Sequence, residues 1–297
     1  MKKSKSSIVR SFCSFPIRFV KKIAQKILQL GEVKPYITVK ISTIEDRLKL
    51  HNKNIVITGG SKGLGFAMAK KFISQGANVI ITGRNKIDLD NAVSILGIKC
   101  HGVMSDVSNV DESKSFIELC ARIFGGTIDC MVCNAGVSLH ESDFTDVTVE
   151  GFDKQFNINF RGTYFLSKAF LEYQHSVKIE KASLLIISSE TSNMAYDIPY
   201  GMTKAALNSM VGALSRRVYK EGIRVNAIAP GVTLSEMTAS YAKSEDGNLY
   251  RKNAANRVFV PEEVAEVAAF ILSDASVCIS GEVIHTNAGN HYRVFWE

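Results

Sequence analysis

TGGSKGLG, residues 58–65, is the stretch of sequence that decides the fold. It follows the apolar run 54–58 and leads into a helical pattern, and Gly59, Gly63 and Gly65 keep the spacing TGxxxGxG. Glycines let the backbone turn sharply and come close to a pyrophosphate, which sits at the positive N-terminus of the helix. A plain glycine-rich turn between a strand and a helix has the same letters, so the interpretation depends on the rest of the chain.

The chain beyond this turn alternates short apolar runs with longer helical patterns. The predicted strands are 54–58, 79–82, 100–105, 130–133, 184–188, 224–228 and 282–285. The helical patterns include 66–75, 111–124, 160–173, 200–219 and 261–273. Because such alternation builds parallel sheets, the sequence predicts one α/β domain over 51–297, with a doubly wound sheet of about seven strands flanked by helices. Ligands bind these sheets beyond the C-terminal ends of the strands.

The first 50 residues differ from the rest in charge. They hold twelve lysines and arginines against three acidic residues, whereas the remainder holds 24 basic and 26 acidic residues. The formal net charge of +7 therefore belongs to this segment. We interpret 1–50 as a basic N-terminal extension and expect no nucleic-acid binding by the domain that follows.

Apolar residues recur at helical spacing within 8–30, although Pro16 interrupts the pattern. Three interpretations are open: an interfacial helix that makes peripheral contact with an anionic membrane, a helix packed on the domain or a partner subunit, and a disordered basic leader. Basic residues interrupt any signal-peptide core, and no run of about 18 apolar residues exists to span a membrane. With six scattered cysteines, the chain is expected in the reducing cytoplasm.

The end of the second predicted strand bears on the choice of nicotinamide cofactor. NAD-binding domains place a carboxylate there to hold the ribose 2′-hydroxyl, but residues 81–85 read ITGRN. Arg84 is suited to a 2′-phosphate instead, and Lys62 in the glycine turn is placed to join it. Two cations and no carboxylate predict NADP(H) rather than NAD(H), the alternative being that Arg84 is only a solvated loop residue.

A tyrosine and a lysine four residues apart supply candidate acid–base chemistry. Tyr200 and Lys204 lie one helical turn apart on the same face. A free tyrosine has a pKa of about 10, and a nearby ammonium lowers it by favouring the phenolate. Such pairs occur by chance on many helices, so the YxxxK motif gains weight only from its companions.

Further motifs come at the ends of the predicted strands and in the helices between them. In chain order they are Asp106-Val107, Asn134-Ala135-Gly136, Asn159, Ser188-Ser189 and Pro230-Gly231. With TGxxxGxG and YxxxK, this ordered series resembles the short-chain dehydrogenase/reductase family over about residues 52–290. The resemblance implies a Rossmann-like fold, hydride transfer between a nicotinamide cofactor and a small-molecule carbonyl or alcohol, and a homo-oligomer, either dimer or tetramer.

The resemblance also implies a role for each matching catalytic residue. Tyr200 is the implied general acid in reduction and base in oxidation. Lys204 is implied to lower the pKa of Tyr200 and to hold the nicotinamide ribose. Asn159 is implied to position a water that relays protons, and a serine to hydrogen-bond the substrate oxygen.

The implied cofactor contacts run along the same motifs. Asp106 and Val107 are expected at the adenine, Asn134 at a ribose and Val232 at the carboxamide. Ser235 stands where the family often has a threonine, and its hydroxyl offers the same hydrogen bond. The full set of expected cofactor-binding residues is Gly59, Ser61, Lys62, Gly63, Leu64, Gly65, Arg84, Asp106, Val107, Asn134, Ala135, Gly136, Tyr200, Lys204, Pro230, Gly231, Val232 and Ser235.

Two serines compete for the substrate-binding role. The family's serine stands about thirteen residues before the tyrosine, whereas Ser189 stands eleven and Ser188 twelve residues before Tyr200. Because the second of two adjacent serines is usually the one used, we predict Ser189, with a loop shortened by two residues. Ser188 remains the alternative.

Three other features are interpreted as structural or uninformative. Cys130 and Cys133 form a CxxC on a strand, where residues i and i+3 point to opposite faces, so we expect buried core residues and no metal site. His140, just beyond Asn134-Ala135-Gly136, is interpreted as a surface-loop histidine, and a place at the substrate site is the alternative. Residues 235–257, the segment that covers the substrate in this family, indicate no particular substrate.

Three functions are consistent with the sequence. The leading one is an NADP(H)-dependent carbonyl reductase or alcohol dehydrogenase with Tyr200 as acid and base. The second is a non-catalytic dinucleotide-binding sensor or scaffold, and the third is dehydratase or epimerase chemistry on the same fold. The presence of Tyr200, Lys204, Asn159 and a serine together favours the enzyme.

Overall fold

The computed structural model describes residues 49–239 and 253–292. The amphipathic pattern at 8–30 and residues 240–252 of the expected substrate cover lie outside these ranges. The chain divides into two units, Met1–Val39 and Lys40–Glu297, and the second holds every described residue. Within it, Leu50 is fully buried and its N–H donates to the Gln75 carbonyl at 3.2 Å.

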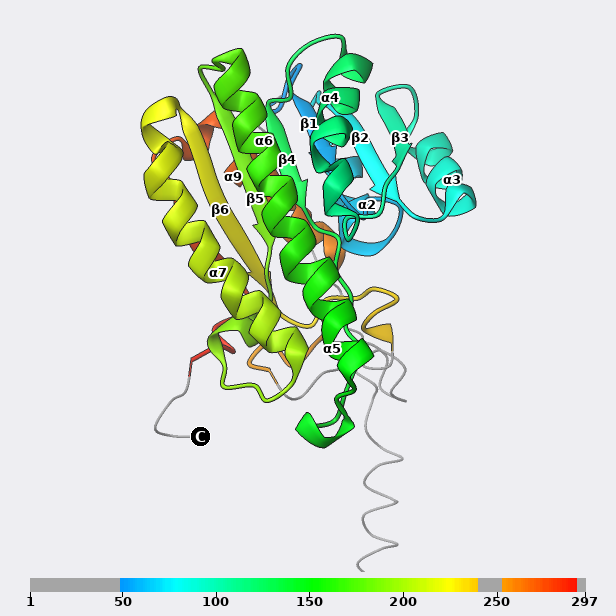
Figure 1. Ribbon diagram of the computed structural model, residues 1–297, viewed down its shortest axis with the longest axis vertical. Coiled ribbons are helices and arrows are strands. Elements are labelled where there is room, and N and C mark those ends of the chain that lie inside the picture. The colour runs from blue at the N-terminus through cyan, green and yellow to red at the C-terminus, as the bar shows by residue number, and fades with distance from the viewer. Residues whose placement is uncertain (1–48, 240–252, 293–297) are drawn as a thin grey trace, which may run out of the picture. The chain divides into compact units, whose positions relative to one another are not determined.

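Seven strands form one parallel sheet, which confirms the predicted fold class (Figure 1). The strands are β1 (Asn54–Ile57), β2 (Asn78–Gly83), β3 (Cys100–Met104), β4 (Cys130–Cys133), β5 (Ala182–Ile187), β6 (Ile223–Pro230) and β7 (Val283–Thr286). Their order is β3-β2-β1-β4-β5-β6-β7. The chain runs outward from β1 through β2 to β3 and then returns to the other side of β1, so the order reverses between β1 and β4. Open α/β sheets bind their ligands at this switch point.

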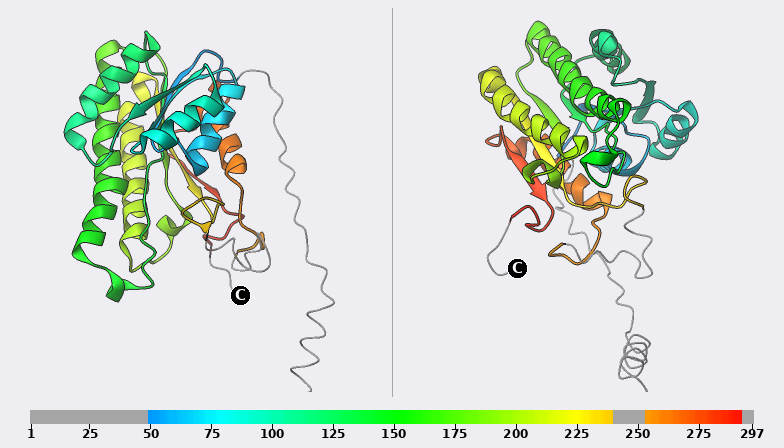
Figure 2. Two further views of the ribbon diagram at one scale, coloured as in Figure 1. Left: turned by 90° about the vertical axis from the view of Figure 1, so that its right-hand side faces the viewer. Right: turned by 60° about the horizontal axis from the view of Figure 1, so that its bottom comes forward.

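Helices cover both faces of the sheet (Figures 1 and 2). One face carries α2 (Gly63–Ser74), α3 (Lys86–Leu96) and α9 (Pro261–Leu272). The other carries α4 (Ser113–Phe124), α6 (Thr163–Val177) and α7 (Pro199–Val218). The apolar pattern did not predict α3, which begins where the Asn85 side chain accepts hydrogen bonds from the N–H groups of Ile87 and Asp88.

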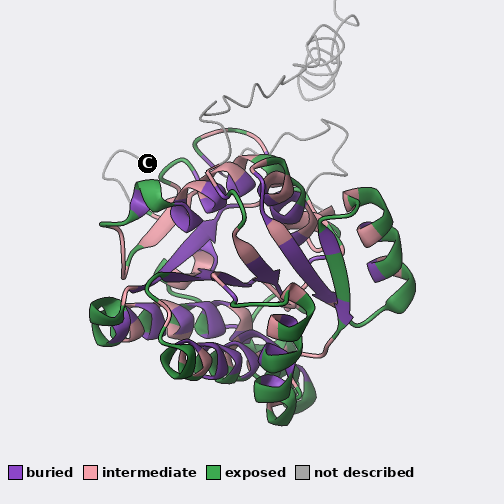
Figure 3. Ribbon diagram, turned by 90° about the horizontal axis from the view of Figure 1, so that it is seen from above, coloured by how far each residue is buried: buried purple, intermediate pink, exposed green. Residues whose placement is uncertain are grey.

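The central strand shows why the strands read as continuous apolar runs. Ile55 and Ile57 pack in the core beneath α2 and α9, whereas Val56 packs in the core beneath α4, α6 and α7. All three are fully buried, and Figure 3 shows the strands enclosed between the two helix layers. Successive residues of a strand point to opposite faces, so a strand covered on both sides needs apolar residues at every position.

The helix predicted over 160–173 is longer and less regular than the pattern indicates. It begins as α5 (Val149–Gln155), continues as a π-helical segment (Phe156–Gly162) and then becomes α6. A Cβ on Gly162 would lie 2.4 Å from the Val107 carbonyl oxygen. The glycine therefore lets this helix approach the loop that follows β3.

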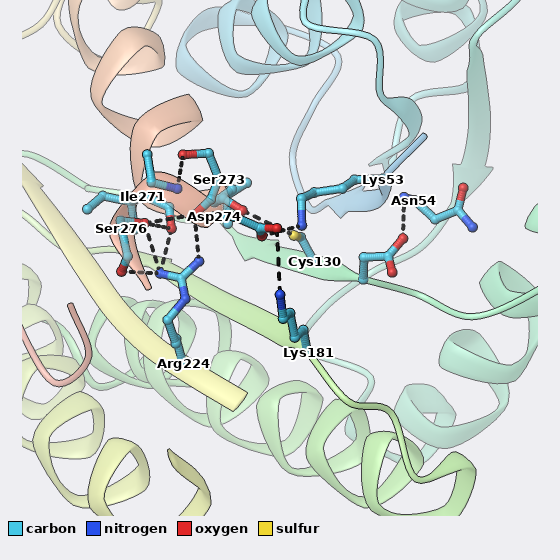
Figure 4. Close-up of polar contacts among 12 residues, drawn as sticks. Lys53, Asn54, Cys130, Lys181, Arg224, Ile271, Ser273, Asp274 and Ser276 are labelled. Atoms are coloured by element: carbon cyan, nitrogen blue, oxygen red, sulfur yellow. Dashed lines mark hydrogen bonds and ion pairs between the residues drawn. The ribbon is translucent and has the colours of Figure 1, made fainter. Parts of the chain in front are cut away.

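At the opposite end of the sheet, Arg224 of β6 closes the C-terminal end of α9 (Figure 4). Its guanidinium is buried and donates to the carbonyl oxygens of Ile271 at 2.8 Å and Ser273 at 3.2 Å, and to Ser276 Oγ at 3.0 Å. The last carbonyls of a helix have no partner within the helix, and its negative end favours a cation. Burial lowers the pKa of Arg224, but the acceptors around it compensate the buried charge.

Arg224→Met is expected to lower the free energy of unfolding by about 2–4 kcal/mol, because it leaves buried carbonyl oxygens without donors. Urea unfolding followed by circular dichroism measures this loss. Arg216→Met, an exposed change on α7, is the matched control and is expected to alter stability by less than about 0.5 kcal/mol. Equal stability of the two variants would contradict the capping role.

Candidate active site

The glycine turn has backbone dihedral angles that residues other than glycine adopt only with strain. Gly59 has a φ of +63° and Gly63 a φ of +53°, a left-handed region that glycine adopts without a steric penalty. A Cβ on Gly65 would lie 2.2 Å from the Gly59 carbonyl oxygen, so the first turn of α2 packs directly on the loop. The result is a cradle of bare backbone at the N-terminus of α2, beside the switch point of the sheet.

Asn134, just past β4, holds this cradle in place. Its Nδ2 donates to the carbonyl oxygens of Thr58 and Gly59, each at 2.9 Å. The Thr58 hydroxyl oxygen in turn accepts from the backbone N–H groups of Asn134 at 3.0 Å and Ala135 at 3.1 Å. Asn134 therefore joins the two loops on either side of the switch point.

A cavity of about 640 Å³ extends from the glycine turn to Tyr200. Its volume is within the range of small-molecule and cofactor sites. The residues predicted from the sequence that line it are Gly59, Lys62, Gly63, Leu64, Gly65, Asn134, Ala135, Gly136, Ser188, Ser189, Tyr200, Lys204, Pro230, Gly231, Val232 and Ser235.

Five predicted residues do not line this cavity: Ser61, Arg84, Asp106, Val107 and Asn159. Asp106 and Val107 line a small separate hollow beyond β3. Burial alone would raise the pKa of Asp106, but two hydrogen bonds from Ser108 and the charge of Arg84 lower it. Arg84 Nη1 lies 3.9 Å from Asp106 Oδ2, and the Arg84 side chain is 59% exposed.

Lys62 has closer carboxylate partners than Arg84 does. Its Nζ lies 3.0 Å from Asp88 Oδ2 and 3.1 Å from Glu236 Oε1. Hydrogen bonds to these two carboxylates raise the pKa of Lys62. Of the two cations predicted to meet a 2′-phosphate, Arg84 is the one without a carboxylate within hydrogen-bond distance among residues 49–239 and 253–292.

The structure places the two serines differently. Ser189 hydrogen-bonds Tyr200, and its Oγ accepts from Thr191 N–H at 3.3 Å and from Thr191 Oγ1 at 3.0 Å. Ser188 Oγ donates to Asn208 Oδ1 at 2.7 Å, which directs it along α7. Ser189 is thus the serine that contacts the tyrosine hydroxyl.

Tyr200 lies in the first turn of α7, directly after Pro199. Burial raises the pKa of its phenol, the hydrogen bond with Ser189 lowers it, and the charges of Tyr196 and Glu190 raise it. The net direction is upward, the opposite of the lowering by Lys204 that the resemblance implies, because burial outweighs the other effects. The phenol of this state therefore carries its proton at neutral pH. A protonated phenol next to a cavity is a proton donor.

Lys204 is buried one turn further along α7, and its Nζ donates to the Ile187 carbonyl at 2.9 Å. The ammonium lies 5.6 Å from the centre of the Tyr200 ring. Burial lowers the pKa of Lys204 from 10.5 to about 8. A Cβ on Gly136 would lie 3.5 Å from Lys204 Nζ and 3.3 Å from Asn159 Oδ1, so this glycine leaves space for both groups.

Asn159 belongs to the π-helical segment and is fully buried. Its Oδ1 accepts from Val137 N–H at 2.8 Å and its Nδ2 donates to the Val137 carbonyl at 2.8 Å. These paired hydrogen bonds fix the loop that follows Asn134-Ala135-Gly136. The side chain lies behind the wall of the cavity rather than on it.

The pKa of Lys204 predicts a pH dependence of stability. Below about pH 8 both folded and unfolded states carry the proton, so burying the ammonium costs about 3 kcal/mol, given an ordinary pKa of 10.5. Between pH 8 and 10.5 the unfolded state binds more protons, and stability rises with pH. Relative to Lys204→Met, the cofactor-free protein is therefore expected to gain up to about 3 kcal/mol over this interval in urea unfolding. A difference between the two proteins that does not change with pH would contradict the lowered pKa.

The cavity also includes residues that the sequence did not single out. They include Ser138, Glu141 and Ser142 after β4, and Glu190, Thr191, Tyr196, Asp197 and Ile198 after β5. His140 lines the cavity as well, in a left-handed conformation with a φ of +59°, and it is an exposed loop residue, so both of its interpretations apply. The signal was available, because both segments directly follow the C-terminal ends of central strands.

Cys130 and Cys133 point into the two opposite cores, as a strand requires. Burial raises the pKa of each thiol to about 12, which leaves little thiolate for metal or redox chemistry at neutral pH. Within residues 49–239 and 253–292, no group of three or more His, Cys, Asp or Glu side chains is placed to hold a metal ion. In the same ranges, no helix has the length and apolar character needed to cross a membrane.

Comparison with known proteins gives consistent matches. A family model described as enoyl-(acyl carrier protein) reductase matches residues 59–291. The chain is 31% identical over 250 residues to an L-rhamnose 1-dehydrogenase (NADP(+)) of Thermoplasma acidophilum, covering 82% of this chain and 97% of that protein. It is 32% identical over 250 residues to a 3-oxoacyl-[acyl-carrier-protein] reductase of Aquifex aeolicus, covering 82% and 98%.

Solved structures give the same result. A short-chain dehydrogenase/reductase of Brucella melitensis, titled glucose/ribitol dehydrogenase, superposes with a TM-score of 0.75 at 29% identity, covering 84% of this chain and 100% of that one. A 3-ketoacyl-(acyl-carrier-protein) reductase from the same organism, complexed with NADH, has a TM-score of 0.75 at 26% identity, covering 82% and 100%. The relatives share a fold and a cofactor class, whereas their substrates range from sugars to acyl carriers.

Proposed function

The chain belongs to the short-chain dehydrogenase/reductase family of NAD(P)-dependent oxidoreductases, and we propose that it is an NADP(H)-dependent member in which Tyr200 is the acid and base. The observation that carries the proposal is the contact of Ser189 with Tyr200, above the Lys204 ammonium, in the cavity that begins at the glycine turn.

The residues of the cavity fit a nicotinamide dinucleotide. At Gly65 even a Cβ would clash with the Gly59 carbonyl, so the turn presents only backbone, as a pyrophosphate requires. From there the cavity continues past Asn134-Ala135-Gly136 and Pro230-Gly231-Val232 to Tyr200. When bound, the nicotinamide supplies or accepts the hydride.

The chain's own residues handle the proton. In the direction of reduction, the Tyr200 hydroxyl gives its proton to the carbonyl oxygen as that oxygen gains negative charge. Ser189, held by its hydrogen bonds from Thr191, binds the same oxygen and positions it at the phenol. The Lys204 ammonium then stabilises the phenolate that remains, since it is buried close to the ring. Oxidation reverses these steps.

Preference for NADP(H) is supported by charge at the end of β2. Arg84 follows Gly83 there, and no carboxylate occupies residues 81–85. Ser61 lies beside the same point, since a Cβ on Gly83 would be 3.3 Å from Ser61 Oγ. A cation and a hydroxyl at this position suit a 2′-phosphate, as the NADP(+)-dependent relative from Thermoplasma acidophilum leads one to expect.

The test of the proposed function is a pair of measurements on the full chain. Titration with NADPH and NADH is expected to give the lower Kd for NADPH. A panel of carbonyls and alcohols, followed by the nicotinamide absorbance, is expected to show turnover. Cofactor binding without turnover of any member of the panel would favour a sensor or scaffold instead.

Ser189→Ala is expected to reduce kcat by about 100-fold, because it removes one hydrogen bond to the reacting oxygen. Ser188→Ala is the matched control and is expected to change kcat by less than about threefold, since Ser188 is bonded to Asn208. Steady-state rates of both variants on one substrate decide the assignment. A larger loss for Ser188→Ala would assign the role to that residue.

A further inference from the structure

The tyrosine end of the cavity is rich in carboxylates. Glu141 and Asp197 line it from the loops after β4 and β5, and Glu190 lines it beside Ser189. Glu190 is buried, and its Oε2 accepts from the amides of Asn287 at 3.2 Å and Asn290 at 3.0 Å. These partners are neutral, so they leave the negative charge uncompensated.

The same end has few cations. Among the described lining residues, the only lysines or arginines are Lys204 beneath Tyr200 and Lys62 at the distant glycine turn. Around the carboxylates the other lining side chains include the hydroxyls and imidazole of Ser138, His140, Ser142 and Thr191, together with the apolar side chains of Tyr196, Ile198 and Met237. A phosphate or carboxylate on the substrate would be repelled here, and an apolar chain would desolvate charged groups without replacing their hydrogen bonds.

Glu141 gives the most specific indication. Its Oε1 accepts from the buried amide of Gln155 at 2.6 Å, which fixes the carboxylate at the cavity wall. Its Oε2 is buried and has no hydrogen-bond partner among the described residues. A buried carboxylate oxygen without a donor is costly. Oε2 has almost no accessible surface, so the Glu141 side chain must shift toward the cavity that it lines before a ligand hydroxyl can reach this oxygen and remove the cost.

We propose, resting on the function proposed above, that the substrate is an uncharged polyhydroxylated compound, an aldose or polyol, whose hydroxyls donate to Glu141 and Asp197 while one carbinol faces Tyr200. In the oxidative direction the carbinol C–H bond breaks and its electron pair passes as hydride to NADP⁺. The hydroxyl proton passes to the Tyr200 phenolate, and a C=O bond forms. The relatives named as sugar dehydrogenases, from Thermoplasma acidophilum and Brucella melitensis, agree with this class, whereas the similarly related acyl-carrier-protein reductases act on a different one.

The test compares probes that differ in one property, with NADP⁺ and the full chain. Neutral aldoses and polyols (L-rhamnose, D-glucose, D-ribose, ribitol) are set against D-glucose 6-phosphate, D-glucosamine and cyclohexanol. We expect kcat/KM to be at least about tenfold higher for the best neutral probe than for each charged or apolar probe. A charged probe or cyclohexanol as the best substrate, with turnover lost in Tyr200→Phe, would overturn this inference and leave the proposed function standing. No turnover of any probe would overturn both.

Variants of Glu141 and Asp197 test whether these carboxylates bind the hydroxyls of the substrate. Glu141→Gln and, separately, Asp197→Asn are expected to lower kcat/KM for the neutral sugar by about 10- to 100-fold, with NADPH affinity unchanged as a check on folding. They are expected to raise the relative rate on D-glucose 6-phosphate. Glu118→Gln, which removes an exposed carboxylate on α4, is the matched control and is expected to leave every rate unchanged. If Glu141→Gln and Asp197→Asn both had the same kcat/KM for the sugar as Glu118→Gln, the assignment of these two carboxylates to substrate binding would be overturned.

Discussion

Tyr200→Phe is expected to reduce kcat/KM by about 10³- to 10⁴-fold, the largest effect of any single change in this chain. The substitution removes one oxygen atom and keeps the ring, so the packing of α7 against the cavity is retained. What is lost is the proton that the carbonyl oxygen needs as the hydride arrives. Burial raises the pKa of Tyr200, so the wild-type phenol carries at neutral pH the proton that it donates in reduction.

Two measurements separate this effect from a structural one. The Kd for NADPH is expected to change by less than about tenfold, because the variant loses at most one hydrogen bond to the cofactor, about 0.5–1.5 kcal/mol. Tyr164→Phe, an exposed tyrosine on α6, is the matched control and is expected to retain full activity. Turnover by Tyr200→Phe within tenfold of wild type would exclude Tyr200 as the acid and base.

The fold could be predicted because its signals are local. The central strands are buried on both faces, so the predicted runs 54–58 and 184–188 are mainly apolar and end within two residues of β1 and β5. The glycine turn could also be predicted from a local signal. Its positive φ values and its close contact at Gly65 favour glycine over residues with a side chain. Helix α3 was missed because its exposed face carries apolar residues such as Ile87 and Ile95, which blur the helical period.

The site was only partly predictable, because side chains meet there from loops that are distant in sequence. Glu141 and Asp197 are 56 positions apart and belong to polar loops that look like ordinary surface. Spacing alone also left Ser188 and Ser189 as alternatives, and the difference between them is a direction: one hydroxyl meets Asn208 and the other meets Tyr200. The direction in which each serine hydroxyl points depends on the turn after β5, where Ser189 caps the N-terminus of a short 3₁₀ helix.

The two cations expected at the 2′-phosphate also differ in a way that depends on residues distant in sequence. Lys62 and Arg84 looked equivalent in the sequence, but Asp88 of α3 and Glu236 of the loop after β6 both lie within 3.1 Å of Lys62. A 2′-phosphate would have to compete with two carboxylates for Lys62, whereas Arg84 has only a 3.9 Å contact with Asp106. The two cations are therefore expected to contribute unequally.

Arg84→Glu is expected to change the ratio of the Kd values for NADPH and NADH by about 10³-fold in favour of NADH. Loss of charge-assisted hydrogen bonds and repulsion of the 2′-phosphate together cost about 3 kcal/mol, or roughly 100-fold in NADPH affinity. The new carboxylate accepts a hydrogen bond from the 2′-hydroxyl of NADH, which contributes the remaining factor of about ten. Fluorescence titration of both cofactors measures the ratio.

Lys62→Ala is the matched comparison for this change. It is expected to weaken NADPH binding by less than about tenfold, because Asp88 and Glu236 already hold much of the Lys62 charge. Raising the salt concentration should narrow the preference of the wild type for NADPH, since the exposed Arg84 is screened, and should leave NADH affinity nearly constant. If Lys62→Ala abolished the preference and Arg84→Glu did not, the 2′-phosphate would lie at the glycine turn rather than beyond β2.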